Sequence, residues 1–189
     1  MQEFKMLTAT VNDAQELVLL INSAYRGERS KKGWTTEAHL IEGDRMNEVA
    51  LTEMIAKPRV VIRKCVNSDH VIVGCVYLEI LEDELYLGLL TVSPDMQAAG
   101  IGKIMLSDAE DVALNQNLSG IVMTVISIRP ELIHWYVRRG FHPTGKIIPF
   151  PTDNTFGRPL QPLELVELKK ELGLKTKISA APGIRSPWS

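Results

Sequence analysis

The sequence lacks several features that would restrict its class. Only two cysteines occur in 189 residues, and both Cys65 and Cys75 lie inside apolar, strand-like runs. A disulfide framework needs more cysteines and an oxidising compartment, so both are predicted to pack within strands. No group of His, Cys, Asp or Glu has metal-ligand spacing, and no local pattern suggests a Ser–His–Asp set. We therefore expect no metal.

Long apolar runs are also missing. No stretch approaches the ~18 apolar residues of a membrane helix. The first ten residues lack the charged start and apolar stretch of a signal peptide. The expected location is therefore cytoplasmic, without a membrane partner. The net charge of -2 gives no overall attraction to nucleic acid, so no nucleic-acid partner is expected either.

The composition is that of a globular protein, with 45% apolar and 23% charged residues. The length fits one sizeable domain and is too short for two ordinary ones. We expect this domain to span residues 1–172. Residues 173–189 lack hydrophobic periodicity and are expected to form a loosely ordered tail.

The pattern of apolar residues predicts a run of consecutive strands, followed by helices and strands that alternate along the chain. The strands are expected at residues 4–10, 59–66, 71–81, 85–92, 120–128 and 163–169. The helices are expected at residues 13–24, 47–57, 100–117 and 131–139. A further helical stretch is expected after a turn at residues 34–37, with an interruption around residues 43–44. The three middle strands are joined by short polar turns and predict an antiparallel meander. The continuous apolar strand at 120–128 is typical of a parallel sheet, so the chain is predicted to form a mixed α/β sheet.

The segment between the strand at 85–92 and the helix at 100–117 carries the most chemical information. Its sequence is Gln97-Ala98-Ala99-Gly100-Ile101-Gly102, followed by Lys103. The first turn of a helix leaves backbone amides unpaired, and the helix dipole favours negative charge there. Glycines let a phosphate approach the backbone closely, and Lys103 adds a positive charge. The segment therefore predicts a phosphate-binding loop.

Two common phosphate-binding motifs do not fit this loop. A P-loop needs a glycine where Gln97 stands and a serine or threonine where Ile104 follows the lysine. A dinucleotide fingerprint needs a third glycine where Met105 stands. The pattern Q-x-x-G-x-G after a strand of a mixed sheet is matched in full.

On these residues the chain resembles the GCN5-related N-acetyltransferase (GNAT) superfamily. The run Gln97–Gly102 is similar to its acetyl-CoA loop, and Trp135-Tyr136-Val137-Arg138-Arg139-Gly140-Phe141 is similar to its Y-x-x-x-G-F signature. The order of elements from Phe4 to about Lys169 also resembles this fold and covers most of the chain. The resemblance implies a mixed sheet of about six to seven strands with helices on both faces. It also implies an enzyme that uses acetyl-CoA as a co-substrate.

The resemblance assigns roles to individual residues. The backbone of the strand end is expected to bind the pantetheine arm, and the amides from Ala98 to Lys103 the pyrophosphate. The expected cofactor-binding residues are Leu90, Thr91, Val92, Gln97, Ala98, Ala99, Gly100, Ile101, Gly102 and Lys103. Tyr136 is expected near the thioester sulfur as the acid, because a phenol of pKa ~10 can protonate a departing thiolate of pKa ~8.5.

The usual general bases of the family are absent from the matched positions. Tyr86 and Thr124 stand where some members have a glutamate, and Arg129 stands where many have an asparagine. Glu84 lies two residues before Tyr86 on the same strand face and is the candidate catalytic base, acting through water. The alternative is that Glu84 is a solvated turn residue.

Two loops are expected to wall the acceptor site, at residues 26–36 and 150–162. The candidate substrate-binding residues are Trp34, Phe156 and Arg158, because aromatic walls with one arginine can hold a small substrate bearing a carboxylate. The alternative is that Trp34 and Phe156 only pack beneath these loops.

Three functions are compatible with this sequence. The favoured one is transfer of an acetyl group to a primary amine of a small molecule, by direct attack in a ternary complex. The alternatives are a protein or peptide N-acetyltransferase and a non-catalytic acyl-CoA-binding module. The long loop at 150–162 favours a covered small-molecule pocket, and the intact Tyr136 favours catalysis. A homodimer is also compatible with the resemblance.

Overall fold

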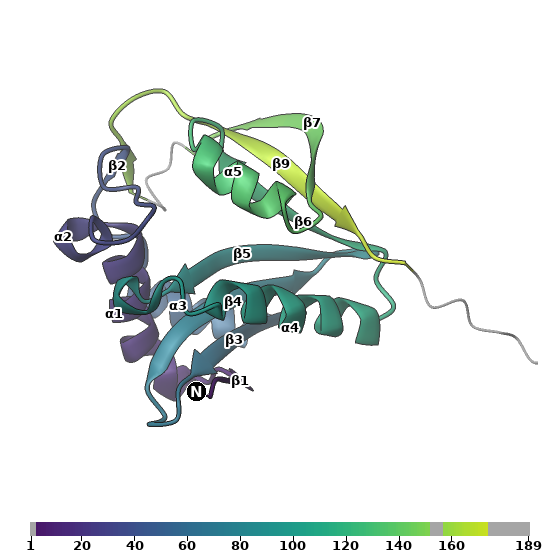
Figure 1. The fold of residues 1–189 in the computed structure, drawn as a ribbon, viewed down its shortest axis with the longest axis horizontal. Helices are drawn as coiled ribbons and strands as arrows, with labels where there is room; N and C mark the ends of the chain where they lie inside the picture. Colours follow the sequence, from purple (N-terminus) through teal and green to yellow (C-terminus); the bar gives the residue numbers. More distant parts are fainter. Residues whose placement is uncertain (1–2, 152–156, 174–189) are drawn as a thin grey trace, which may run out of the picture.

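A seven-stranded mixed sheet forms the centre of the molecule, whose computed structural model describes residues 3–151 and 157–173 (Figure 1). In spatial order its strands are β1 (Lys5–Thr8), β3 (Val60–Val66), β4 (Ile72–Ile80), β5 (Glu84–Val92), β6 (Gly120–Ile126), β9 (Glu164–Glu171) and β7 (His142–Pro149). Within the described residues, β5 and β6 form the single parallel pair, and all other neighbours are antiparallel. A separate two-stranded sheet joins β2 (Ile41–Glu42) to β8 (Arg158–Pro159), so the helical stretch expected after residue 37 is replaced by a turn and a short strand.

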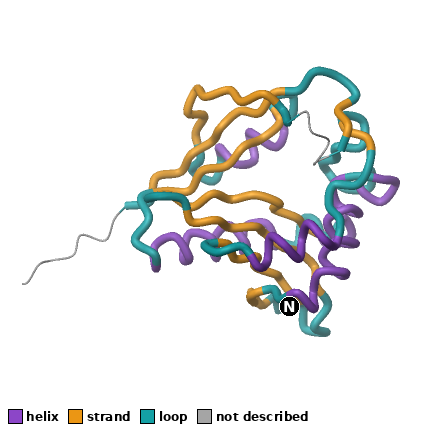
Figure 2. Tube along the Cα trace, turned by 180° about the vertical axis from the view of Figure 1, so that it is seen from behind, coloured by secondary structure: helices purple, strands orange, loops and turns teal. Residues whose placement is uncertain are grey.

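Helices cover both faces of the sheet. They are α1 (Ala14–Tyr25), α2 (Gly27–Ser30), α3 (Glu48–Ala56), α4 (Ile101–Asn115) and α5 (Pro130–Val137). Short 3-10 turns, η1 (Val11–Asp13) and η2 (Pro94–Met96), precede α1 and the loop before α4. Seen from behind, the strands form two groups that diverge from one end of the sheet (Figure 2). The expected mixed sheet with helices on both faces is confirmed.

The helix starts follow local sequence signals. Thr10 and Asp13 form a capping box before α1, in which the Asp13 carboxylate accepts the Thr10 amide at 2.7 Å. Asn47 caps α3, because its side chain accepts the Ala50 amide at 2.8 Å. Pro130 occupies the first turn of α5, where a missing N–H costs nothing.

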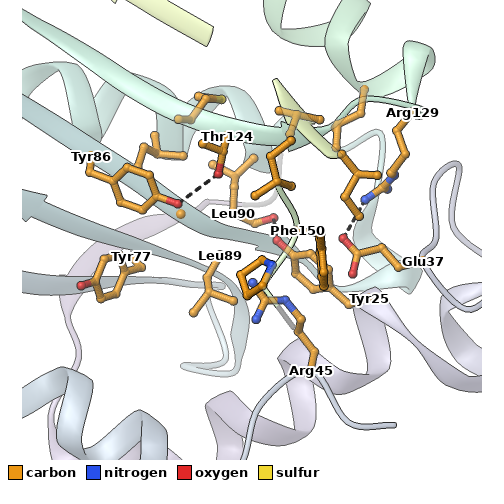
Figure 3. Close-up of a pocket in the computed structure, with 18 of the residues that line it drawn as sticks. Tyr25, Glu37, Arg45, Tyr77, Tyr86, Leu89, Leu90, Thr124, Arg129 and Phe150 are labelled. Carbon is orange, nitrogen blue, oxygen red and sulfur yellow. Dashed lines mark hydrogen bonds and ion pairs between the residues drawn. The ribbon is translucent and has the colours of Figure 1, made fainter. Parts of the chain in front are cut away.

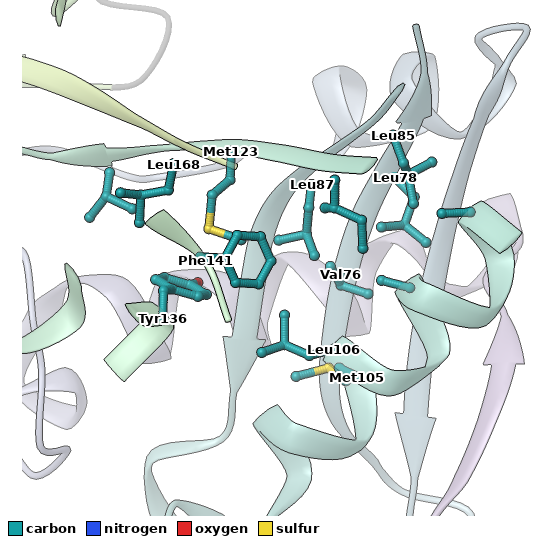
Figure 4. Packing of buried hydrophobic residues seen from close by; sticks show 14 of the residues in the cluster. Val76, Leu78, Leu85, Leu87, Met105, Leu106, Met123, Tyr136, Phe141 and Leu168 are labelled. Atoms are coloured by element: carbon teal, nitrogen blue, oxygen red, sulfur yellow. The ribbon is translucent and has the colours of Figure 1, made fainter. Parts of the chain in front are cut away.

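Two apolar clusters pack against opposite faces of the sheet. Met105 and Leu106 of α4 pack with strand residues such as Val76 and Leu87 on one face (Figure 4). On the other face Leu17 of α1 and Leu51 of α3 are fully buried against β3 and β4. Each of these helices buries an apolar stripe against the sheet, as its pattern of apolar residues predicts.

Strand β7 has no counterpart among the expected strands. It contains Pro143, Gly145 and Pro149, residues that are depleted in strands, and its pairing with β9 shifts between Pro143 and Ile147. An edge strand tolerates prolines, because one side of its backbone needs no partner. The position of β7 at the edge of the sheet explains why its sequence does not look like a strand.

The parallel pair β5–β6 is short. Register is kept for three residue pairs, from Glu84 opposite Gly120 to Tyr86 opposite Val122, and the strands then part (Figure 1). Strand β6 remains paired with β9 along its whole length, from Gly120 to Ile126. The second half of β5 therefore stays with β4 while β6 leaves it, and the sheet opens between them.

The core makes a stability prediction. Leu168 is fully buried beside α5, so Leu168→Ala is expected to lower the free energy of unfolding by about 2–5 kcal/mol. Leu19→Ala is the matched control, because Leu19 is 67% exposed on α1 and its truncation should cost less than about 0.5 kcal/mol. Thermal unfolding of both variants checks this. Equal melting temperatures would contradict the assignment of Leu168 to the core.

Candidate functional site

Two cavities meet where β5 and β6 part. The larger has a volume of about 430 Å³ and includes Tyr77 and Tyr86, which pack with the α1 and α3 cluster. The smaller has a volume of about 90 Å³ and includes Val92 and Trp135, which pack with the α4 and α5 cluster. The residues that line both are Tyr25, Leu90, Arg129, Leu132 and Tyr136. A ligand on one face of the sheet can thus reach a ligand on the other face at these five residues.

The loop before α4 has the backbone geometry of an anion site. Ala98 and Gly100 have φ angles of 75° and 82°, and α4 begins at Ile101. The amides of Gly100, Ile101 and Gly102 form no hydrogen bond with any other described residue. Gly102 faces the Trp135 ring so closely that an added Cβ would lie 3.1 Å from it. The loop thus offers unpaired amides at a helix start, the arrangement that fits a pyrophosphate.

The strand segment expected to bind the pantetheine arm is distorted where the sheet opens. Leu89 has a φ of 48°, and the pairing of β4 with β5 shifts across this stretch. Such a bulge redirects the backbone. The carbonyl of Leu90 accepts a hydrogen bond from the Tyr25 hydroxyl at 3.2 Å, and Thr91 and Val92 line the smaller cavity.

Tyr136 lies at the junction of the two cavities and is 5% exposed. Its ring meets Trp135 and Phe141 edge to face, at centroid distances of 5.0 and 5.7 Å. Burial raises the pKa of Tyr136 above its ordinary value, so the phenol keeps its proton at neutral pH. No described residue hydrogen-bonds its hydroxyl, which leaves this group available to a ligand.

A buried ion network lies beside Tyr136. Glu37 accepts a hydrogen bond from Arg129 at 3.0 Å (Figure 3). Glu37 also pairs with Arg26 at 3.5 Å. Arg129 also donates to Thr35. All three ionised side chains are at most 8% exposed. The sequence identified Arg129 only as a departure from the family pattern, and Glu37 gave no signal because its partners are distant in the chain.

The far end of the larger cavity holds a second carboxylate. Glu79 accepts hydrogen bonds from Tyr77 and from Lys57, each at 2.7 Å. The Lys57 hydrogen bond lowers the pKa of Glu79 below its ordinary value, so the side chain is ionised at neutral pH. Tyr86 lies opposite Glu79 in the register and contacts Thr124 at 3.3 Å (Figure 3). The sequence signal was the i, i+2 spacing of Tyr77 and Glu79, which places both on one strand face.

The structure brings only some of the expected site residues together. Trp34 lines the smaller cavity, where its amide donates to the Gln97 side chain at 2.8 Å and its ring stacks on Trp135. Arg158 lies in β8, pairs with Glu42 and is outside both cavities. Phe156 lies outside the described residues. Among the described residues, Trp34 and Arg158 therefore do not line a common cavity, and the assignment of Trp34, Phe156 and Arg158 to acceptor binding stays a prediction.

Glu84 is also not brought to the site. It is the first residue of β5, at the closed end of the β5–β6 pair, and its carboxylate pairs with Lys169 at 2.7 Å. Neither cavity includes it. The residue of β5 that lines both cavities is Leu90, which lies near the other end of the strand.

Two absences hold for the described part of the chain. No three His, Cys, Asp or Glu side chains among residues 3–151 and 157–173 come close enough to hold a metal ion. No described helix is both long and apolar enough to cross a membrane.

Comparison with known sequences gives one family. The family model described as the acetyltransferase (GNAT) family matches residues 15–141. This range includes the loop from Gln97 to Gly102 and the signature from Tyr136 to Phe141. It also includes the five residues that line both cavities. A search of curated proteins gives no match.

Solved structures share the fold at low sequence identity. The ribosomal-protein-S18-alanine N-acetyltransferase from Escherichia coli has a TM-score of 0.67 at 14% identity, covering 93% of this chain and 98% of that chain. The PaiA N-acetyltransferase from Thermoplasma acidophilum, in complex with coenzyme A, has 0.66 at 16%, covering 90% and 99%. Mutant forms of the spermidine/spermine N-acetyltransferase SpeG from Vibrio cholerae have 0.65 at 13%, covering 89% and 93%.

The loop geometry makes a binding prediction. Gly100→Val forces a β-branched residue into the left-handed region, which costs about 1–3 kcal/mol and distorts the start of α4. We expect the affinity for acetyl-CoA, measured by calorimetry, to fall at least about tenfold. Gly145→Val is the matched control, since Gly145 has a φ of 87° and open space around it but lies in β7. Equal affinities in the two variants would show that the loop does not bind the ligand.

Proposed function

The chain belongs to the GNAT family of acetyltransferases, and we propose that it transfers the acetyl group of acetyl-CoA to a small amine bound in the larger cavity. The observation that carries this proposal is the meeting of two cavities, on opposite faces of the sheet, at one set of five residues. A volume of about 430 Å³ fits a small molecule and lies within the usual range of ligand pockets. The alternative acceptor, a peptide or protein, needs a groove open along its length.

The smaller cavity and the loop before α4 are the proposed acetyl-CoA side. The unpaired amides of Gly100, Ile101 and Gly102 would hold the pyrophosphate, and Lys103 is exposed beside them. The strand segment from Leu90 to Val92 would position the pantetheine arm along the opening of the sheet. Acetyl-CoA supplies an acetyl group activated as a thioester.

Tyr136 is the proposed acid. It lies at the junction, its hydroxyl is free of described partners, and burial keeps it protonated. A proton donor is needed there because the sulfur leaves as a thiolate. Bringing the two reactants together in one opening of the sheet contributes most of the remaining rate, on the order of 7–11 kcal/mol for well-oriented reactions.

The acceptor amine must lose its proton before it attacks. Of the two carboxylates that line the larger cavity, Glu37 is held by two arginines, and the pKa of Glu79 is lowered. Neither is suited to take a proton from an ammonium group near neutral pH. We therefore propose that the amine gives its proton to water, which agrees with the distance of Glu84 from the site.

This proposal predicts the pH profile. With no protein base, kcat/KM should rise with pH until the acceptor amine itself is deprotonated. Two acceptors whose amino groups differ widely in pKa should therefore give profiles displaced by that difference. Thiol release across pH measures both. If kcat/KM rose with the same apparent pKa for both acceptors, a titrating group of the protein would be responsible instead.

The acid role predicts the effect of Tyr136→Phe. This variant keeps the ring packing against Trp135 and Phe141 but removes the proton donor, so kcat should fall about 10²-fold. Its affinity for acetyl-CoA should stay within about threefold, which separates catalysis from binding. Unchanged turnover across pH would remove Tyr136 from the acid role. If the wild type released no thiol with any amine or peptide, the chain would be an acyl-CoA-binding module.

A further inference from the structure

Arg129 differs from the other residues that the two cavities share. Among the described residues, those that line both are Tyr25, Leu90, Arg129, Leu132 and Tyr136, and Arg129 is the one charged side chain in this set. Two of the others are leucines, and the two tyrosines keep their protons at neutral pH because burial raises their pKa. A positive charge therefore lies where the acetyl group and the acceptor are proposed to meet.

We infer that Arg129 is a further catalytic residue, whose guanidinium group donates hydrogen bonds to the thioester carbonyl oxygen and stabilises the negative charge that forms there. This inference rests on the proposed acetyltransferase function and adds a residue to its mechanism.

The reaction places that negative charge on one oxygen atom. The amine nitrogen, after losing a proton to water, forms a bond to the carbonyl carbon, and the electron pair of the C=O π bond moves to the oxygen. When the C–S bond breaks, the pair on oxygen re-forms the carbonyl group, and the sulfur leaves with the C–S pair and takes the proton of Tyr136. Arg129 neither gains nor loses a proton in these steps.

The contacts of Arg129 hold its guanidinium group in place. One terminal nitrogen donates to the Glu37 carboxylate at 3.0 Å, and the other donates to the Thr35 hydroxyl (Figure 3). The side chain is 6% exposed, and its Nε lies 3.6 Å from the Glu131 carboxylate. A charged group that is fixed before the reaction needs no reorganisation when charge develops, which is the condition for strong electrostatic stabilisation.

The fixed guanidinium group keeps hydrogen-bond donors for a ligand. Each of its two terminal nitrogens carries two N–H groups. The described residues accept one hydrogen bond from each of these nitrogens, so one N–H of each is left for a ligand oxygen. Hydrogen bonds in which a partner is ionised are roughly twice as strong as neutral ones, so these contacts strengthen as the carbonyl oxygen becomes an oxyanion.

The charge of Arg129 acts on the other polar groups at the junction. Burial raises the pKa of Tyr25 to about 12 and raises that of Tyr136 as well, and the charge of Arg129 acts in the opposite direction on both. Arg129 thus favours negative charge on either phenol. An oxyanion beside these hydroxyl groups is stabilised in the same way, and more strongly than in water because the site has a low dielectric constant.

Kinetics of Arg129→Gln test the inference. With whichever of tyramine, spermidine and glucosamine the wild type acetylates fastest, kcat should fall about 10²–10³-fold, the usual effect of removing one oxyanion donor. The KM of the amine and the Kd of acetyl-CoA should stay within about threefold, because the contact is strongest in the transition state. Arg129→Lys keeps the charge and should recover at least about tenfold of the lost kcat.

Arg63→Gln is the matched control for the loss of an ion pair. Arg63 donates to the Asp108 carboxylate at 2.8 and 2.7 Å and lines neither cavity. This variant should keep the wild-type kcat even where its melting temperature falls. If Arg129 only held the ion network together, kcat would fall in both variants in proportion to the loss of melting temperature, and the inference would be wrong.

The carbonyl stretching frequency of bound acetyl-CoA gives a readout that needs no acceptor and that a purely structural role would not move. Acetyl-CoA labelled with a heavy isotope at the carbonyl carbon is bound to each protein and measured by infrared difference spectroscopy. Hydrogen bonds from a guanidinium group polarise the C=O bond, so the labelled band should lie at lower frequency in the wild type than in Arg129→Gln. In Arg63→Gln it should match the wild type.

The band position separates the inference from the proposed function. If the band has the same frequency in the wild type and in Arg129→Gln, another group polarises the carbonyl, and the acetyltransferase proposal stands without this role for Arg129. If Arg129→Gln does not fold, Arg129→Lys takes its place, and an unchanged band and kcat there would contradict the inference. If acetyl-CoA does not bind the wild type, the proposed function fails as well.

Discussion

The parting of β5 and β6 after three paired residues is the constraint on which the rest of the site depends. Parallel strands that stayed paired would satisfy each other's backbone groups and close the sheet. Because β6 follows β9 instead, and β5 bulges at Leu89, the backbone near Leu90 faces an opening. The two cavities, the position of Tyr136 and the access from both faces all follow from this separation.

Side chains replace the missing strand pairing across the opening. The hydroxyl of Tyr25 bonds to the Leu90 carbonyl, and Glu37 joins Arg26 to Arg129. The segment that carries these residues thus connects the half of the sheet that ends at β5 to α5 of the other half. Breaking such a buried network by removing one partner is strongly destabilising, so the network also holds the two halves at a fixed separation.

Particular residues show which parts of the site and fold could be predicted from the sequence. The sequence singled out the loop from Gln97 to Gly102 and the tyrosine at 136 because each belongs to a contiguous motif, and Gln97, Gly102 and Tyr136 line the same smaller cavity. Strand β7 was missed because an edge strand can contain prolines that the strand pattern excludes. Arg158 was assigned to the acceptor pocket because its loop was expected there, but β8 pairs with β2 and turns Arg158 toward Glu42.

The sequence by itself determined most of the order of helices and strands and the family, since these depend on hydrophobic periodicity and on contiguous motifs. It also predicted that the loop at 97–102 binds an anion, because that depends on backbone requirements within a few residues. Only the tertiary structure decided which side chains form the larger cavity. Tyr25, Glu37, Arg45, Glu79 and Arg129 come from five separate segments, and long-range ion pairs and register bring them together. Such contacts leave no local pattern, because they depend on where distant backbone segments meet and not on the residues beside them.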